Sequence, residues 1–150
     1  MAVKKGERMW SRIRKFLGRA EPALSESTER WVLSQAEFVA TLVRQQLKAS
    51  GLSPMEAWRR NRAPFLGYIC GMTEHLCAKQ KIKKSVPGVA LLALVAIVED
   101  GLTPDEIMTA CVSLQQIQDI GYVAAHKIGW HDLGVLSPNA MPTGLSKLLV

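Results

Sequence analysis

The sequence predicts an all-α protein, a single-domain helical bundle of about five to six helices. Apolar residues recur at helical spacing in nearly every segment, and two turns carry the residue pattern of a capping box. A chain of 150 residues that is 48% hydrophobic is long enough to bury one core. We expect a basic amphipathic helix over residues 1–21, the bundle over 22–130 and an irregular tail over 131–150.

The first nineteen residues carry the whole net charge of the chain, because they contain seven basic residues and one acidic residue, Glu7, which gives +6. On a helical wheel, Met9, Trp10, Ile13, Phe16, Leu17 and Ala20 share one face. The opposite face holds Arg8, Arg12, Lys15 and Arg19. The pattern therefore predicts a cationic amphipathic helix that ends before Pro22.

Three interpretations of this helix stay open. It could lie on an anionic membrane surface, contact nucleic-acid phosphates, or dock its apolar face on the bundle while the arginines stay solvated. A mitochondrial transit peptide has similar chemistry. The candidate membrane- or partner-binding residues are Arg8, Trp10, Arg12, Ile13, Lys15, Phe16, Leu17 and Arg19.

The next helix is expected to begin near Ser25 or Ser27 and to end at Gly51, a natural left-handed C-terminal cap. Its buried face is predicted to be Val32, Ala36, Val39, Val43 and Leu47. Its solvated face is predicted to be Arg30, Ser34, Glu37, Thr41, Arg44 and Lys48.

Two similar turns divide the rest of the bundle. Ser53 and Glu56 form the first capping box, which predicts a short helix from Pro54 to about Asn61 and another from Pro64 into the lysines at 79–84. A helix over about 87–99 leads to the second box, formed by Thr103 and Glu106. The tripeptide Gly-Tyr-Ile at 67–69 also has a close match, Gly-Tyr-Val, at 121–123.

These matches predict two related helix-turn-helix hairpins, a possible internal repeat of 36–80 and 86–128. The alternative is that two hairpins converged on one favourable turn sequence. Residues 36–85 carry a net charge of +6 and residues 86–150 carry −4. The basic arm could therefore find an electrostatic partner in its own chain.

The stretch from Val43 to Arg62 resembles a DNA-binding helix-turn-helix, because a second helix rich in Arg and Asn follows its turn. Arginine can pair with guanine, and asparagine with adenine. Two features weaken the resemblance: Leu47 stands where the motif prefers a small residue, and Trp58 would have to be buried. The candidate nucleic-acid contacts are Arg59, Arg60, Asn61 and Arg62.

We expect no catalytic residues, no metal site and no cofactor. Cys70 and Cys77 share a helix face, but a zinc site needs three or four converging ligands, so core packing is the simpler interpretation. The carboxylates of residues 99–106 lack the alternation of an EF-hand loop. Three cysteines without a disulfide framework or a visible secretory signal favour a cytoplasmic location, with peripheral membrane attachment as a variant.

Glycines inside the helices predict close helix contacts. Gly67 and Gly71 lie one turn apart, and we expect Gly121 with Ala124 and Ala125 to play the same part in the second copy. The apolar terminus that begins at Leu145 is expected to dock on the body or on a partner.

The sequence thus favours a non-enzymatic interaction or regulatory protein. A protein partner is the first choice, and recruitment to an anionic membrane is an option for the N-terminal helix. The alternative is a DNA- or RNA-binding protein that uses the arm together with the arginines at 59–62, and a small helical enzyme is a second alternative.

Overall fold

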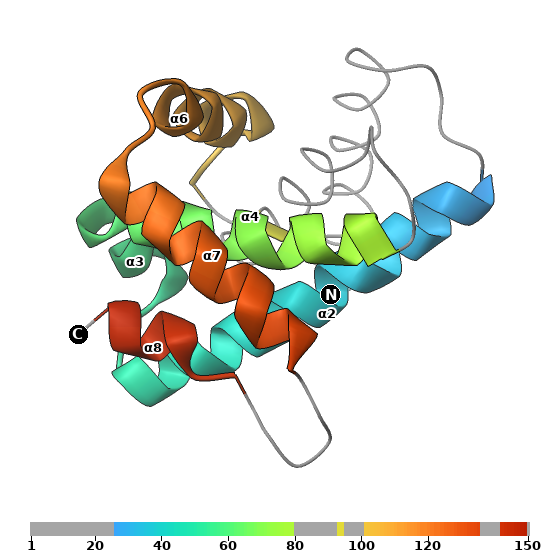
Figure 1. Cartoon of the computed structure of the whole chain (residues 1–150), viewed down its shortest axis with the longest axis horizontal. Helices are drawn as coiled ribbons and strands as arrows, with labels where there is room; N and C mark the ends of the chain where they lie inside the picture. Colours follow the sequence, from blue (N-terminus) through green and yellow to red (C-terminus); the bar gives the residue numbers. More distant parts are fainter. Residues whose placement is uncertain (1–25, 80–92, 95–100, 136–141, 150) are drawn as a thin grey trace.

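The computed structural model describes residues 26–79, 93–94, 101–135 and 142–149, and this part of the chain is all-α (Figure 1). Its helices are α2 (Glu26–Ser50), α3 (Pro54–Arg60), α4 (Arg62–Lys79), α6 (Pro104–Gln116), α7 (Ile120–Gly134) and α8 (Gly144–Leu148). The predicted fold class is confirmed at this level. The basic helix predicted over 1–21 lies outside the described residues. So does most of the helix predicted over 87–99, of which Ala93 and Leu94 are helical and fully buried.

Helix α2 has the two faces that its periodicity predicts. The five residues of the predicted inner face are buried, and the six of the predicted outer face are exposed. The helix ends at Gly51, which has a φ of +69°. The Leu52 N–H then donates to the Leu47 carbonyl at 3.0 Å, a hydrogen bond typical of a glycine C-terminal cap.

Both predicted capping boxes form. Ser53 and Thr103 have extended backbones, and each hydroxyl accepts a hydrogen bond from the N–H of the glutamate three residues later. Each glutamate carboxylate accepts in return from the backbone N–H of its capping residue. The two turns therefore start α3 and α6 by the same local chemistry.

Helix α4 begins at Arg62, two residues before the predicted start at Pro64. Asn61 alone interrupts the helical path, with φ −134° and ψ 47°. Pro64 is tolerated in the first turn, because the N–H that proline lacks would have no helical acceptor there.

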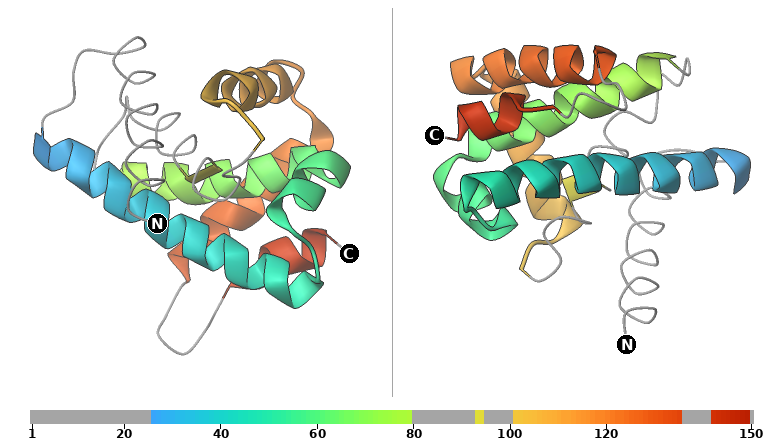
Figure 2. Two further views of the ribbon diagram at one scale, coloured as in Figure 1. Left: turned by 180° about the vertical axis from the view of Figure 1, so that it is seen from behind. Right: turned by 90° about the horizontal axis from the view of Figure 1, so that it is seen from below.

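The centre of the bundle is α4, which lies between α2 and α7 (Figure 2). Nine consecutive α4 residues, 65–73, are buried. A helix that is apolar on all sides belongs in a core with partners on several faces. Here α2, α3, α6, α7 and α8 all contact α4.

Glycines bring α4 and α7 into backbone contact. A Cβ atom placed on Gly67 would lie 2.3 Å from the Tyr122 carbonyl oxygen, and one on Gly71 would lie 2.1 Å from the His126 carbonyl oxygen. From the other side, a Cβ on Gly129 would lie 2.1 Å from the Tyr68 carbonyl oxygen. The close contact predicted for Gly67 and Gly71 is confirmed.

The matching prediction for the second copy is wrong in two of its three residues. Gly121 and Ala124 are exposed, while Ala125 is buried. The close approach on α7 is made by Gly129 instead, two turns further along the helix. The reason is the direction in which these residues face: α7 already contacts α4 at Tyr122, but the neighbouring Gly121 and Ala124 lie on the exposed side of the helix.

The tail predicted to be irregular over 131–150 contains helical structure. Helix α7 continues through its glycines to Gly134, and α8 packs against α2, α4 and α7. The predicted docking of the apolar terminus on the body is confirmed for Leu145 and Leu149, which are buried.

A buried polar network holds α8 in place. The Gln46 amide donates to the Tyr68 hydroxyl at 3.0 Å, and its oxygen accepts from the Leu145 N–H at 2.9 Å. The Tyr68 hydroxyl donates to Asp132 Oδ2 at 2.7 Å, and the same oxygen accepts from the Gly144 N–H at 2.9 Å. Burial raises the pKa of Tyr68 far above its usual range, so the phenol remains a donor. The network joins α2, α4, α7 and α8.

None of the described helices combines the length and the apolar character that crossing a bilayer requires.

Candidate functional site

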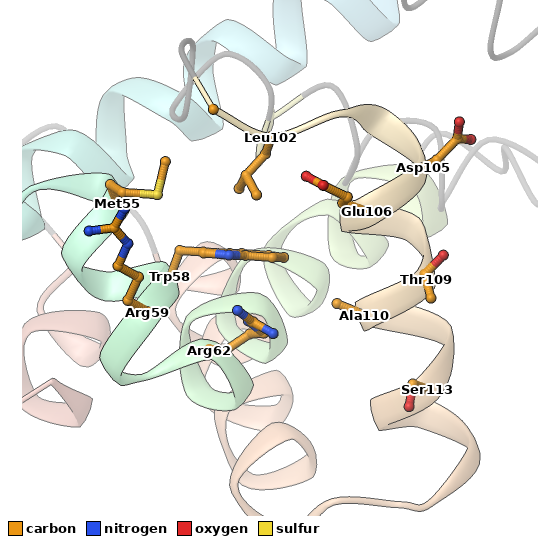
Figure 3. A pocket seen from close by; sticks show the side chains of 11 residues that line it. Met55, Trp58, Arg59, Arg62, Leu102, Asp105, Glu106, Thr109, Ala110 and Ser113 are labelled. Carbon is orange, nitrogen blue, oxygen red and sulfur yellow. The ribbon is translucent and has the colours of Figure 1, made fainter.

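A groove of about 840 Å³ separates α3 from α6, and we call it the α3–α6 groove (Figure 3). Its lining combines an apolar floor with charged walls. The apolar residues are Met55, Trp58, Leu102 and Ala110, and the charged residues are Arg59, Arg62, Asp105 and Glu106.

Trp58 forms the floor of the groove. The residue is only 6% exposed, and Figure 3 shows its ring extending from α3 toward α6. The Arg62 guanidinium carbon lies 4.3 Å from the centre of the indole ring, a cation–π contact. The arginine is thereby held at the groove while its own side chain stays exposed.

The two walls carry opposite charges. Arg59 and Arg62 belong to α3 and to the start of α4, and Asp105 and Glu106 belong to the first turn of α6. In Figure 3 the Glu106 side chain points toward the groove and Asp105 points away from it. A ligand in this groove would meet aromatic surface flanked by positive charge on one side and negative charge on the other.

The structure brings some of the candidate nucleic-acid residues together and separates others. Arg59 and Arg62 line the groove, whereas Arg60 is exposed but does not line it. Asn61 lies at the break between α3 and α4, so it is not part of an exposed helix face. The four residues therefore do not form one continuous reading face. All residues of the candidate N-terminal site lie outside the described part of the chain.

The acidic wall is the part of the site that sequence reasoning missed. Asp105 and Glu106 are explained locally by the capping box and the helix dipole, so nothing in their spacing indicates a wall opposite Arg59. The possible internal repeat was an indirect signal of this wall, because the two similar capping-box turns that it pairs both border the groove.

A second cluster lies where α4, α6 and α7 meet. All three cysteines are buried, as core packing predicts, but the thiols that approach each other are those of Cys70 and Cys111, with their Sγ atoms 4.0 Å apart. Burial raises the pKa of Cys77 to about 11, which keeps that thiol protonated.

An ion pair borders the thiols. His126 Nε2 on α7 contacts the Glu74 carboxylate on α4, and both side chains are partly buried. The hydrogen bond to Glu74 raises the pKa of His126, against the opposing effect of burial. A smaller hollow of about 330 Å³ opens beside this pair and is also lined by Gln115, Tyr122 and Lys127.

The His126–Glu74 pair predicts a pH dependence of stability. Because folding raises the His126 pKa, its contribution is fully present below the unfolded pKa of about 6.5 and is lost as pH rises through the folded pKa. Unfolding of the wild type and of Glu74→Gln should be measured in urea between about pH 6 and pH 8. The stability advantage of the wild type over Glu74→Gln is expected to shrink with rising pH. A constant advantage would contradict the role given to the His126–Glu74 pair.

Within the described residues, no group of three or more His, Cys, Asp or Glu side chains is arranged to hold a metal ion. The chain matches no protein-family model, no curated protein and no solved structure at a significant level. Function must therefore be argued from the groove itself.

Proposed function

We propose that this chain is a non-enzymatic interaction protein that binds a short segment of a partner protein in the α3–α6 groove. The observation that carries the proposal is the combination of an indole floor with walls of opposite charge. Tryptophan and arginine are the side chains that most often dominate the binding energy of protein interfaces.

The groove also specifies the chemistry of the segment. An apolar side chain would cover the half-buried Met55 and Leu102, beside the nearly buried Trp58, and would remove their apolar surface from water. An acidic residue on one side would meet Arg59 and Arg62, and a basic residue on the other side would meet Glu106. Opposed charges of this kind fix the direction and register of a bound segment more than they add affinity.

The basic N-terminal segment fits the proposal as a second contact. Its +6 charge would attract an acidic partner or an anionic membrane surface and would raise the association rate. Vesicles containing phosphatidylserine test the membrane option. If the segment binds membrane, these vesicles should sediment the full chain but not a chain lacking residues 1–20. Equal sedimentation of both chains would end this part of the proposal.

The groove is tested by selecting peptides from a random library on the full chain and measuring the affinity of the selected sequences. We expect them to carry an apolar residue between an acidic and a basic one. The double variant Arg59→Glu/Arg62→Glu should weaken their binding by about 10- to 100-fold, because it places like charges opposite the acidic residue. Arg60→Glu is the matched control, since Arg60 is a neighbouring exposed arginine outside the groove.

The control also separates the proposal from nucleic-acid binding. A phosphate-binding surface would use Arg59, Arg60 and Arg62 alike, and its affinity would fall steeply with salt. Equal losses in the single variants Arg59→Glu, Arg60→Glu and Arg62→Glu, with DNA or RNA retarded at low salt, would favour the nucleic-acid alternative. Selected peptides that bind the double variant as tightly as the wild type would contradict the groove.

A further inference from the structure

The Cys70 and Cys111 thiols lie within hydrogen-bonding distance of each other in the core. Cys70 comes from the buried helix α4 and Cys111 from α6, and their sulfur atoms are 4.0 Å apart. A disulfide requires about 2.05 Å, so a shift of about 2 Å, shared between two helices, would join them. The third thiol, Cys77, forms no hydrogen bond with either.

The two thiols are not equivalent. The hydrogen bond to Cys111 and burial raise the pKa of Cys70, whereas the same hydrogen bond lowers the pKa of Cys111. Cys111 is also the more exposed residue, at 7% against 3%. Both residues are buried, so it is the lowered pKa that makes Cys111 the more nucleophilic sulfur of the pair.

We propose that Cys70 and Cys111 form a reversible dithiol–disulfide couple that a hydroperoxide oxidises. The Cys111 thiolate attacks the outer peroxide oxygen, the O–O bond breaks, and Cys111 becomes a sulfenic acid as the hydroperoxide is reduced to an alcohol, or to water when it is hydrogen peroxide. The Cys70 sulfur then attacks the Cys111 sulfur and displaces water, which leaves the disulfide. A dithiol reductant reverses the oxidation by thiol–disulfide exchange and returns both cysteines to thiols.

The couple would act on the wall of the α3–α6 groove. Ala110, next to Cys111, and Glu106, one turn earlier, both line that groove. A disulfide would fix α6 against α4 and so change the separation of the two walls. This link to binding rests on the proposed function, but disulfide formation itself does not.

The test oxidises the reduced full chain with hydrogen peroxide at a small molar excess. We expect a mass loss of about 2 Da, a fall from three free thiols to one, and a peptide map that joins Cys70 to Cys111 and leaves Cys77 free. Cys77→Ser is the matched control and should oxidise like the wild type. Dithiothreitol should restore the original mass.

Stability gives a second readout on unmutated protein. A bond that closes the loop from residue 70 to 111 should raise the Tm by about 6–12 °C, and reduction should reverse the rise. A disulfide that includes Cys77, oxidation that stops at sulfinic acid, or three unchanged thiols would overturn the couple. Peptide affinity is measured separately, so a disulfide that forms without altering affinity would refute only the link to the groove.

Discussion

Replacing Gly71 with alanine is expected to lower the free energy of unfolding by about 3 kcal/mol, at the upper end of the usual cost of overpacking a core. The added methyl group would lie 2.1 Å from the His126 carbonyl oxygen and 3.0 Å from the Trp130 amide nitrogen. Both are backbone atoms of α7, so no side chain can rotate to make room. The helices would have to separate along the largest interface of the bundle.

The sign of this effect is informative, because glycine inside a helix costs about 1 kcal/mol relative to alanine. If α4 and α7 did not touch at Gly71, the substitution would therefore stabilise the protein. Gly121→Ala is the control. Gly121 is exposed in the first turn of α7, where an added methyl group would lie 3.3 Å from the Asp119 Oδ1 side-chain atom and 3.9 Å from the nearest atoms of another helix. We expect its urea midpoint to stay constant or rise, while that of Gly71→Ala falls; a rise in both would contradict the close contact.

Replacing Gln46 with leucine is expected to cost about 2–4 kcal/mol of unfolding free energy. The substitution keeps the side chain's approximate size but removes the acceptor of the buried Leu145 N–H and the donor to the Tyr68 hydroxyl. The Leu145 N–H is left buried without a partner, which costs about 1–3 kcal/mol, and the Tyr68 hydroxyl loses one hydrogen bond, worth about 1 kcal/mol, but keeps the one to Asp132. Helix α8 should therefore loosen first.

The neighbouring residue supplies the control for this prediction. Gln45 has the same side chain on the same helix but is exposed, so Gln45→Leu should change stability by no more than about 0.5 kcal/mol. Urea unfolding gives the global cost, and hydrogen exchange at the Leu145 amide reports on α8 directly. Equal stability of the two variants would show that the network contributes nothing.

The elements that could be predicted from the sequence are those determined by neighbours along the chain. The faces of α2 follow from a 3.6-residue period, and the starts of α3 and α6 follow from contacts between residues three apart. Gly67 and Gly71 could be recognised as packing positions because glycine is costly inside a helix.

What could not be predicted depends on distant partners. Gln46 meets Leu145 across 99 positions, and Cys70 meets Cys111 across 41. Periodicity places a residue on a face of its own helix but does not say which helix covers that face. For this reason the sequence predicts Gly121 as the packing residue where the structure has Gly129, and predicts an irregular tail where apolar residues hold α8 on the core.

The candidate site divides in the same way. The resemblance to a helix-turn-helix singles out Arg59 and Arg62, and the structure adds that Trp58 lies under Arg62 and that α6 lines the other side of the groove. More than half of the groove's lining thus comes from residues 101–113, whose charges the sequence explains only by local capping.

We propose above all that partners bind between α3 and α6. Nuclear magnetic resonance of the isotope-labelled full chain, titrated with the tightest selected peptide, tests it most directly. We predict that the Trp58 indole N–H and the amides of Glu106 and Ala110 shift the most, while the exposed Trp130 indole on α7 does not move. Shifts centred on Trp130 or on the exposed Ile120, with Trp58 unchanged, would contradict the claim.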